Sequence, residues 1–167
     1  MKLLKTKYLL ALMVPIIFVC GCGYKLRTWD LSENIDTIFV SSNSASPIFD
    51  PLADALGQAG VQVIAVAGDA DLAVRLGQYV RTRRTASVNR RASAADYQLS
   101  LRVTYEIFEG GERILGPQAA RAYRVYRVDR DNIVGSSEEE ALLETEMKVD
   151  LVQQIVRAIN AVTKEKD

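Results

Sequence analysis

The clearest pattern in the chain is an alternation of apolar and polar side chains over residues 97–108, with the apolar ones at odd positions. A period of two is typical of a half-buried β-strand. Residues 72–81 show the same period, with Leu72, Val74 and Leu76 at even positions. We therefore predict two long strands. In the strand that starts at residue 72, the odd positions would then point outward and carry Arg75, Tyr79, Arg81 and Arg83. Arg102 of the other strand would share this face.

Shorter apolar runs predict strands over residues 35–40 and 61–67. A helix between them would start at Ser46-Pro47 or at Asp50-Pro51, because an N-cap residue followed by proline is a helix start signal. Gly60 would end this helix as the first residue beyond it.

The C-terminal half predicts a further strand and a long helix. Gly110-Gly111 suits a hairpin turn leading into a strand over residues 114–128, in which Pro117 marks either the entry of the strand or an irregular edge. Ser136 and Ser137 ahead of an acidic run resemble a capping box, and an apolar stripe with a 3.6-residue period follows over residues 138–162. The predicted fold class is α+β, with a four- to five-stranded, mixed but mostly antiparallel sheet and two helices packed on one face.

The N-terminus has the form of an export signal. Three lysines precede an apolar run over residues 8–19, which as a helix spans about 18 Å, against roughly 30 Å for the hydrocarbon core of a bilayer. The run ends in Val19-Cys20-Gly21-Cys22, similar to a lipobox in which a small residue precedes the lipidated cysteine. We expect residues 1–21 to be a removed signal peptide. Residues 22–167 would form one periplasm-facing domain, anchored through lipid on Cys22; a plain signal peptide is the alternative.

The amino-acid composition limits the catalytic and metal sites that the chain can form. The chain has 167 residues, no histidine, two cysteines and equal numbers of basic and acidic residues. Without histidine, the commonest general base and metal ligand is absent. Asp69 and Asp71 could form a catalytic pair, but aspartates are common where a strand starts. We therefore predict that the protein is not an enzyme and holds neither metal nor cofactor.

Arginine is concentrated in the middle of the chain. Residues 75–130 hold twelve arginines, no lysine and five acidic residues, a net charge of +7. Guanidinium groups bind phosphate and carboxylate through paired hydrogen bonds, although a general preference for arginine would give the same composition. The densest group is predicted to contact an anionic ligand or partner, and consists of Arg81, Arg83, Arg84, Arg90 and Arg91. An exported protein meets little nucleic acid, so we expect no nucleic-acid partner.

Three segments resemble one family. Gly23-Tyr24-Lys25-Leu26-Arg27 follows the lipobox cysteine, and two further matching segments span residues 84–90 and 95–99. Together with the order of the elements, they resemble the LPS-assembly lipoprotein family, LptE. The resemblance implies an outer-membrane protein that plugs the lumen of the LPS-transport β-barrel LptD and binds lipopolysaccharide (LPS).

The resemblance also implies roles for single residues. Arg90 falls at a family position tied to LPS binding, and a second basic position of the family falls at Ser136, which carries no charge. Pro117, Tyr123 and Arg124 fall where family members contact the barrel. The alternative function is an outer-membrane lipoprotein scaffold for another envelope machine, in barrel assembly or in the regulation of cell-wall synthases.

Overall fold

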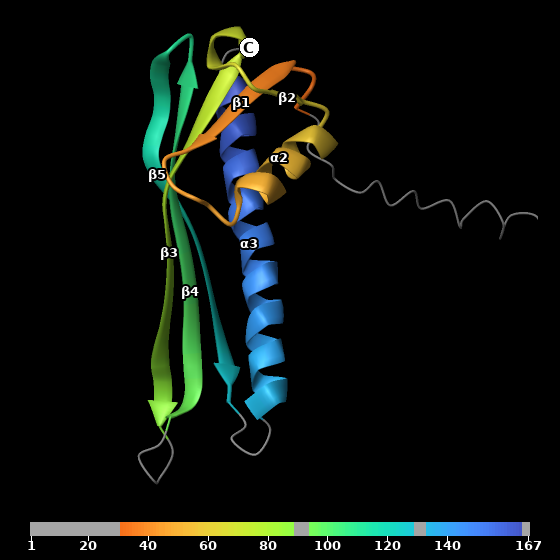
Figure 1. The fold of residues 1–167 in the computed structure, drawn as a ribbon. Coiled ribbons are helices and arrows are strands. Elements are labelled where there is room, and N and C mark those ends of the chain that lie inside the picture. The colour runs from red at the N-terminus through yellow and green to blue at the C-terminus, as the bar shows by residue number, and fades with distance from the viewer. Residues whose placement is uncertain (1–30, 89–93, 129–132, 165–167) are drawn as a thin grey trace, which may run out of the picture.

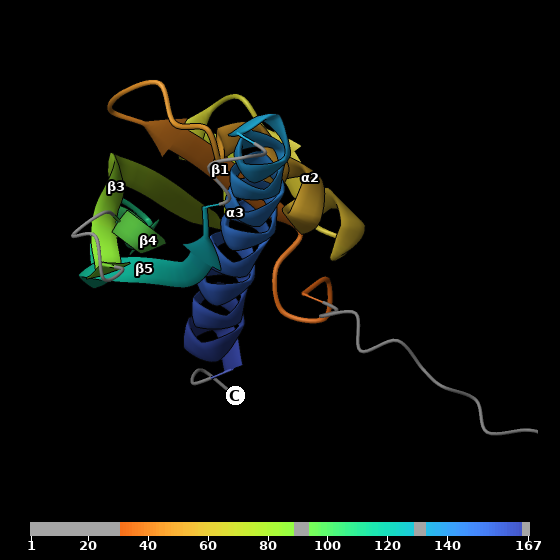
Figure 2. The ribbon, with the colours of Figure 1, turned by 90° about the horizontal axis from the view of Figure 1, so that it is seen from below.

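The structure is a computed structural model that describes residues 31–88, 94–128 and 133–164. Its five strands form one sheet in the order β2-β1-β3-β4-β5, parallel across β2-β1-β3 and antiparallel across β3-β4-β5. The α+β prediction is confirmed, and both helices cover the same face (Figures 1 and 2). In chain order the elements are β1 (Thr37–Ser42), α2 (Phe49–Gln58), β2 (Gln62–Ile64), the 3₁₀ turn η1 (Ala67–Asp69), β3 (Leu72–Val88), β4 (Ala94–Glu109), β5 (Glu112–Arg127) and α3 (Ile133–Lys164).

The alternation predicted for β4 is confirmed residue by residue. Leu99, Leu101, Val103 and Ile107 are at most 1% exposed, and they point toward α3. The helix contributes its own apolar stripe to the same core, made of Met147, Leu151, Val152, Ile155, Val156 and Ile159. Burial of this apolar surface is the main force that holds α3 on the sheet.

The face predicted for the distal half of β3 is wrong. Leu76 pairs with Tyr105, but Tyr79 pairs with Val103, so two residues of β3 stand opposite Thr104 alone. Such a bulge exchanges the faces of all later side chains. Gly77 permits it, because a Cβ there would lie 2.3 Å from Thr104 Oγ1.

The bulge decides where the hairpin arginines point. Arg81 lies opposite Leu101 and Arg83 opposite Leu99, so Tyr79 and both arginines lie on the face that α3 covers. Arg75, before the bulge, and Arg102 remain on the outer face. The predicted single row of arginines on one face is therefore divided between two faces.

Helix starts also differ from the predictions. α2 begins at Phe49, between the two expected starts, because the fully buried Ile48 fixes the chain there and accepts a hydrogen bond from Leu52 N–H. Gly60, at φ 85°, ends the helix as predicted. The predicted strand over residues 61–67 is shorter in the structure, because β2 ends at Ile64 and η1 begins at Ala67.

The long helix α3 begins at Ile133, five residues before the predicted start. Ser136 lies inside it and is 8% exposed, and the Ser137 hydroxyl donates to the Val134 carbonyl at 2.8 Å. The predicted capping box is therefore wrong, because a serine hydroxyl inside a helix can bond to a carbonyl of the preceding turn.

The edge strand β5 is tied to α3 through its backbone. The side-chain amide of Gln154 donates to the Arg121 carbonyl at 2.9 Å, and its oxygen accepts the Arg121 N–H at 3.1 Å. Pro117 also lies in this strand, after a cis Gly116-Pro117 bond and beside a register shift against β4. This confirms the irregular edge predicted there.

Candidate functional site

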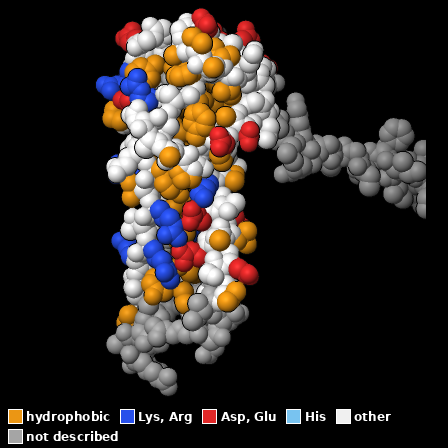
Figure 3. All heavy atoms as spheres, in the orientation of Figure 1, with side chains coloured by type: hydrophobic (Ala, Val, Ile, Leu, Met, Phe, Trp, Pro, Cys, Tyr) orange, Lys and Arg blue, Asp and Glu red, His pale blue; other side chains and the backbone are white. Residues whose placement is uncertain are grey.

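The most densely connected polar side chains of the described residues lie between the long β3–β4 hairpin and α3. We call this group the hairpin–helix cluster; its members are Tyr79, Arg81, Arg83, Tyr97, Tyr126, Glu140 and Glu144. Figure 3 shows basic and acidic side chains meeting in the half of the molecule near the hairpin tip. The bulge in β3 creates this cluster, because it turns both arginines toward the helix.

Ion pairs join the hairpin to two successive turns of α3. Arg81 Nε lies 2.8 Å from Glu144 Oε2, and the same guanidinium pairs with Glu140. Arg83 Nε lies 3.5 Å from Glu140 Oε2. The carboxylates are only 17% and 23% exposed, so solvent screens these pairs less than it screens pairs at an open surface.

Aromatic rings complete the cluster. The Arg83 guanidinium carbon lies 3.9 Å from the centroid of the Tyr97 ring, within the range of a cation–π contact. Tyr97 stacks with Tyr126 at 6.2 Å between centroids, and the Tyr126 hydroxyl donates to Glu140. Glu140 is thus contacted by two arginines and one phenol.

These contacts change the ionisation of the cluster. Burial raises the pKa of Tyr126, and its hydrogen bond to Glu140 adds to this effect, giving a pKa of about 12. Burial alone would raise the pKa of Glu140, but hydrogen bonds from Tyr126 and Arg81 outweigh it and lower that pKa. The pKa of Glu144 is lowered in the same way, against burial, by Lys148 and Arg81.

The lowered pKa of Glu144 predicts a loss of stability in acid. A carboxyl with a lower pKa in the folded chain stabilises the fold fully above its unfolded value of 4.5. That contribution is lost as pH falls through the folded value. We expect Glu144→Gln to be less stable than the unchanged protein at pH 7, and the difference to shrink by pH 3. Urea unfolding at several pH values measures this difference in stability. A difference that stays constant with pH would contradict the lowered pKa of Glu144.

The five predicted ligand-binding arginines do not form one site within the described residues. Arg81 and Arg83 are held by α3. Arg84 lies on the outer face, where Gln98 Oε1 accepts its hydrogen bonds at 2.9 and 3.2 Å. Arg90 and Arg91 lie outside the described residues, as do the predicted signal peptide of residues 1–21 and the predicted lipid site Cys22.

The three predicted barrel contacts lie on different surfaces. Tyr123 is 68% exposed on the outer face of β5, opposite Ser100. Arg124 points inward and pairs with Asp150 of α3 at 2.6 Å. Pro117 is exposed near the start of the same strand.

Of the predicted aspartate pair, Asp71 has a structural role, and Asp69 is exposed in η1. Asp71 accepts hydrogen bonds from the N–H groups of Thr37 at 2.8 Å and Asp36 at 3.0 Å, which fixes the start of β1 against β3. The Thr37 backbone bond is the main cause of the lowered pKa of Asp71. Among the described residues there is no group of three or more acidic, Cys or His side chains that could hold a metal, and none of their helices is long and apolar enough to cross a membrane.

Sequence reasoning missed the acidic half of the cluster. The capping-box prediction includes Glu140 in the acidic run at the helix start, and no predicted site includes Glu144. Their spacing of four residues places them on one face of a helix. That spacing is the signal that could have marked them as partners for two arginines two positions apart on a strand.

The chain matches one protein family and shares its fold with solved structures. Residues 35–159 match the model of the LptE family, described as lipopolysaccharide-assembly. No curated protein matches the chain. Three solved structures share the fold. An uncharacterised lipoprotein B from Nitrosomonas europaea has a TM-score of 0.73 at 19% identity, covering 78% of this chain and 85% of its own. Rare lipoprotein B from Shewanella oneidensis has a TM-score of 0.69 at 21% identity, and the match covers 78% of this chain and 98% of that protein. A minor lipoprotein from Acinetobacter baumannii has a TM-score of 0.61 at 25% identity, and the match covers 76% of this chain and 92% of that protein.

Proposed function

The chain belongs to the LptE family of lipopolysaccharide-assembly proteins, and from this we propose that it is a non-enzymatic plug and assembly partner of the barrel LptD that binds LPS. The family match over residues 35–159 carries the proposal. It includes the long hairpin, the cluster behind it and most of α3. We further propose that lipid on Cys22 anchors the protein to the outer membrane.

The LPS site proposed here lies at the hairpin tip. Arg84, Arg90 and Arg91 would supply guanidinium forks for the phosphates and carboxylates of LPS. Arg81 and Arg83 have a different part in this proposal, because α3 already neutralises them. They hold the base of the tip against the helix, so that the other arginines are presented from a fixed support.

The barrel-facing surface proposed here is the outer face of β4 and β5. Gln98, Ser100 and Arg102 alternate along β4 on this face, and a face of this kind suits the polar, wet lumen of a large barrel. Tyr123 adds an exposed aromatic ring to it. Arg124 is assigned a supporting role, since its ion pair with Asp150 turns it away from this face.

Charge removal at the tip tests the LPS site. We expect Arg90→Ala combined with Arg91→Ala to weaken LPS binding at least tenfold, because each charge-assisted hydrogen bond is worth about 1.5–3 kcal/mol. The matched control is Arg113→Ala with Arg157→Ala, which removes the same charge elsewhere. Titration with fluorescent LPS measures both; equal affinities would refute the site.

A second experiment tests the partner separately. The tagged full-length protein is purified from detergent-solubilised outer membranes, and the co-purifying proteins are identified. We expect a large β-barrel protein in equimolar amount, and retained by the tip variant. Recovery of cell-wall synthases, or of the lipoprotein alone, would instead support the scaffold alternative.

A further inference from the structure

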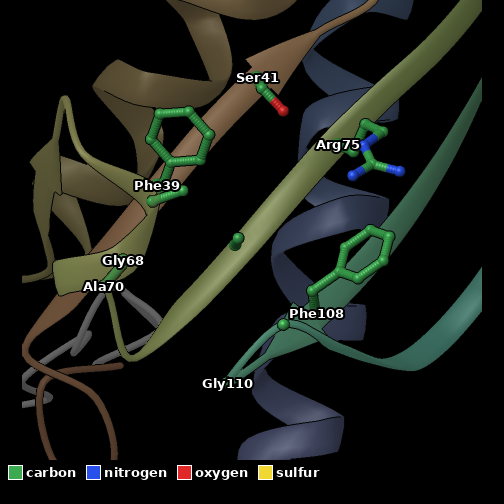
Figure 4. A pocket seen from close by; sticks show the side chains of 10 residues that line it. Phe39, Ser41, Gly68, Ala70, Arg75, Phe108 and Gly110 are labelled. Carbon is green, nitrogen blue, oxygen red and sulfur yellow. The ribbon is translucent and has the colours of Figure 1, made fainter.

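A concave site lies on the outer face of the sheet, at the end far from the hairpin tip. The pocket has a volume of about 470 Å³, within the usual range for ligand sites of about 300–1,000 Å³. Strands β1, β3 and β4 form its floor and walls, and η1 and the turn at Gly110-Gly111 both lie at the end where β3 begins (Figure 4). None of its lining residues is among those given a role in the LPS site or the barrel-facing surface.

The register of three strands makes the pocket a slot with aromatic walls. Phe39 of β1, Ala73 of β3 and Phe108 of β4 stand side by side in one row across the sheet. Neighbouring strands lie about 4.8 Å apart, so the two phenylalanines are carried by strands about 10 Å apart. Ala73, whose side chain is a single methyl group, lies between them in this row. One apolar chain fits over this floor with a ring on each side.

One end of the slot carries positive charge. Arg75 lies beside Phe108, with its guanidinium carbon 4.4 Å from the ring centroid, and Figure 4 shows it at the rim with Ser41 across β3. Its acidic neighbour Glu106 is shared: it lies 3.7 Å from Arg75 but 2.7 Å from Arg113. Because none of the lining residues is acidic, the Arg75 end favours an anion.

We propose that this pocket binds a single-chain anionic amphiphile. The head group, a phosphate or carboxylate, bonds to the Arg75 guanidinium and the Ser41 hydroxyl. The chain lies over Ala73 between Phe39 and Phe108. A neutral amphiphile would leave the guanidinium without a new partner, and a cationic one would be repelled.

This site is independent of the LPS site proposed at the hairpin tip. Val88 follows Ala73 by 15 positions along β3, which corresponds to about 50 Å at roughly 3.3 Å per residue. Substitutions at the tip should therefore leave the pocket unchanged, and the two proposals can fail separately.

The test uses residues 22–167 with Cys22→Ser. Every buried side chain of the described fold lies between Leu31 and Thr163, so this chain retains the whole core. The probe is dodecyl phosphate below its critical micelle concentration, titrated by calorimetry and by backbone NMR shifts. Dodecyl maltoside has the same alkyl chain without a charge, and inorganic phosphate has the charge without an alkyl chain. We expect dodecyl phosphate to bind and the other two probes not to bind. Dodecyl phosphate should shift the backbone NMR signals of Phe39, Ala73 and Phe108.

Two substitutions locate the site. Arg75→Gln should weaken dodecyl phosphate binding at least tenfold, and Ala73→Leu should abolish it by filling the floor. Arg102→Gln and Ala119→Leu are the matched controls on the same face outside the pocket, and should bind normally. Thermal unfolding checks that each variant folds; if Ala73→Leu does not, Arg75→Gln decides. Equal affinity for dodecyl maltoside, or unchanged binding by the folded pocket variants, would overturn the proposal.

Discussion

Replacing Glu140 by lysine is expected to lower the free energy of unfolding by about 2–4 kcal/mol. The carboxylate pairs with Arg81 and Arg83 and accepts the hydroxyl of Tyr126. Removing one partner of a fully buried ion pair costs about 3–5 kcal/mol, and the 17% exposure of Glu140 reduces this. A lysine would add repulsion between cations. Urea unfolding monitored by circular dichroism gives the value.

The control is Glu146→Lys, which makes the same charge change on an exposed position of α3. It should alter the free energy of unfolding by no more than about 0.5 kcal/mol, as surface substitutions generally do. If the two variants were equally stable, the cluster would not hold the hairpin to the helix. The supporting role proposed for Arg81 and Arg83 would then be wrong.

Leu151→Ala should destabilise the protein by about 3 kcal/mol. Leu151 is fully buried in the middle of α3, and buried leucine-to-alanine substitutions cost about 2–5 kcal/mol, since they remove apolar contacts and leave a cavity. The slope of unfolding free energy against urea should stay the same, because the surface exposed on unfolding hardly changes.

The matched variant for this second prediction is Leu142→Ala. The same side chain is removed from the same helix, but Leu142 is 61% exposed. Its cost should stay below about 1 kcal/mol. Equal losses at both positions would mean that α3 does not pack on the sheet through Leu151.

Much of the fold could be predicted because its signals are local. The alternation over β4 fixes which side chains are buried, since the side chains of a strand repeat with a period of two. The 3.6-residue stripe of α3 gives the packing face of the helix in the same way. Gly60 could be assigned to the end of α2 because a backbone with positive φ favours glycine.

The distal face of β3 could not be predicted, because the bulge is a property of a pair of strands. Read alone, residues 72–81 alternate without interruption past Gly77. Only pairing with β4 shows that two residues there oppose Thr104. The prediction for the site is wrong for the same reason, because it places Arg81 and Arg83 on the outer side of the sheet.

The outer pocket is a further case of non-local structure. Phe39 and Phe108 are 69 positions apart in the sequence, and they face one slot only because β1 and β4 flank β3. Apolar residues at outward positions of two strands do not predict a cavity by themselves. The strand order and the small residue between them are also needed.

The contact between Gln154 and Arg121 has a consequence for self-association. An edge strand with free N–H and C=O groups is a template on which another chain can add a strand. The amide of Gln154 occupies both groups of Arg121, as a sixth strand would. At this point along β5 a second copy finds no free backbone groups, so the helix that covers the core also protects this part of the β5 edge from the addition of another strand.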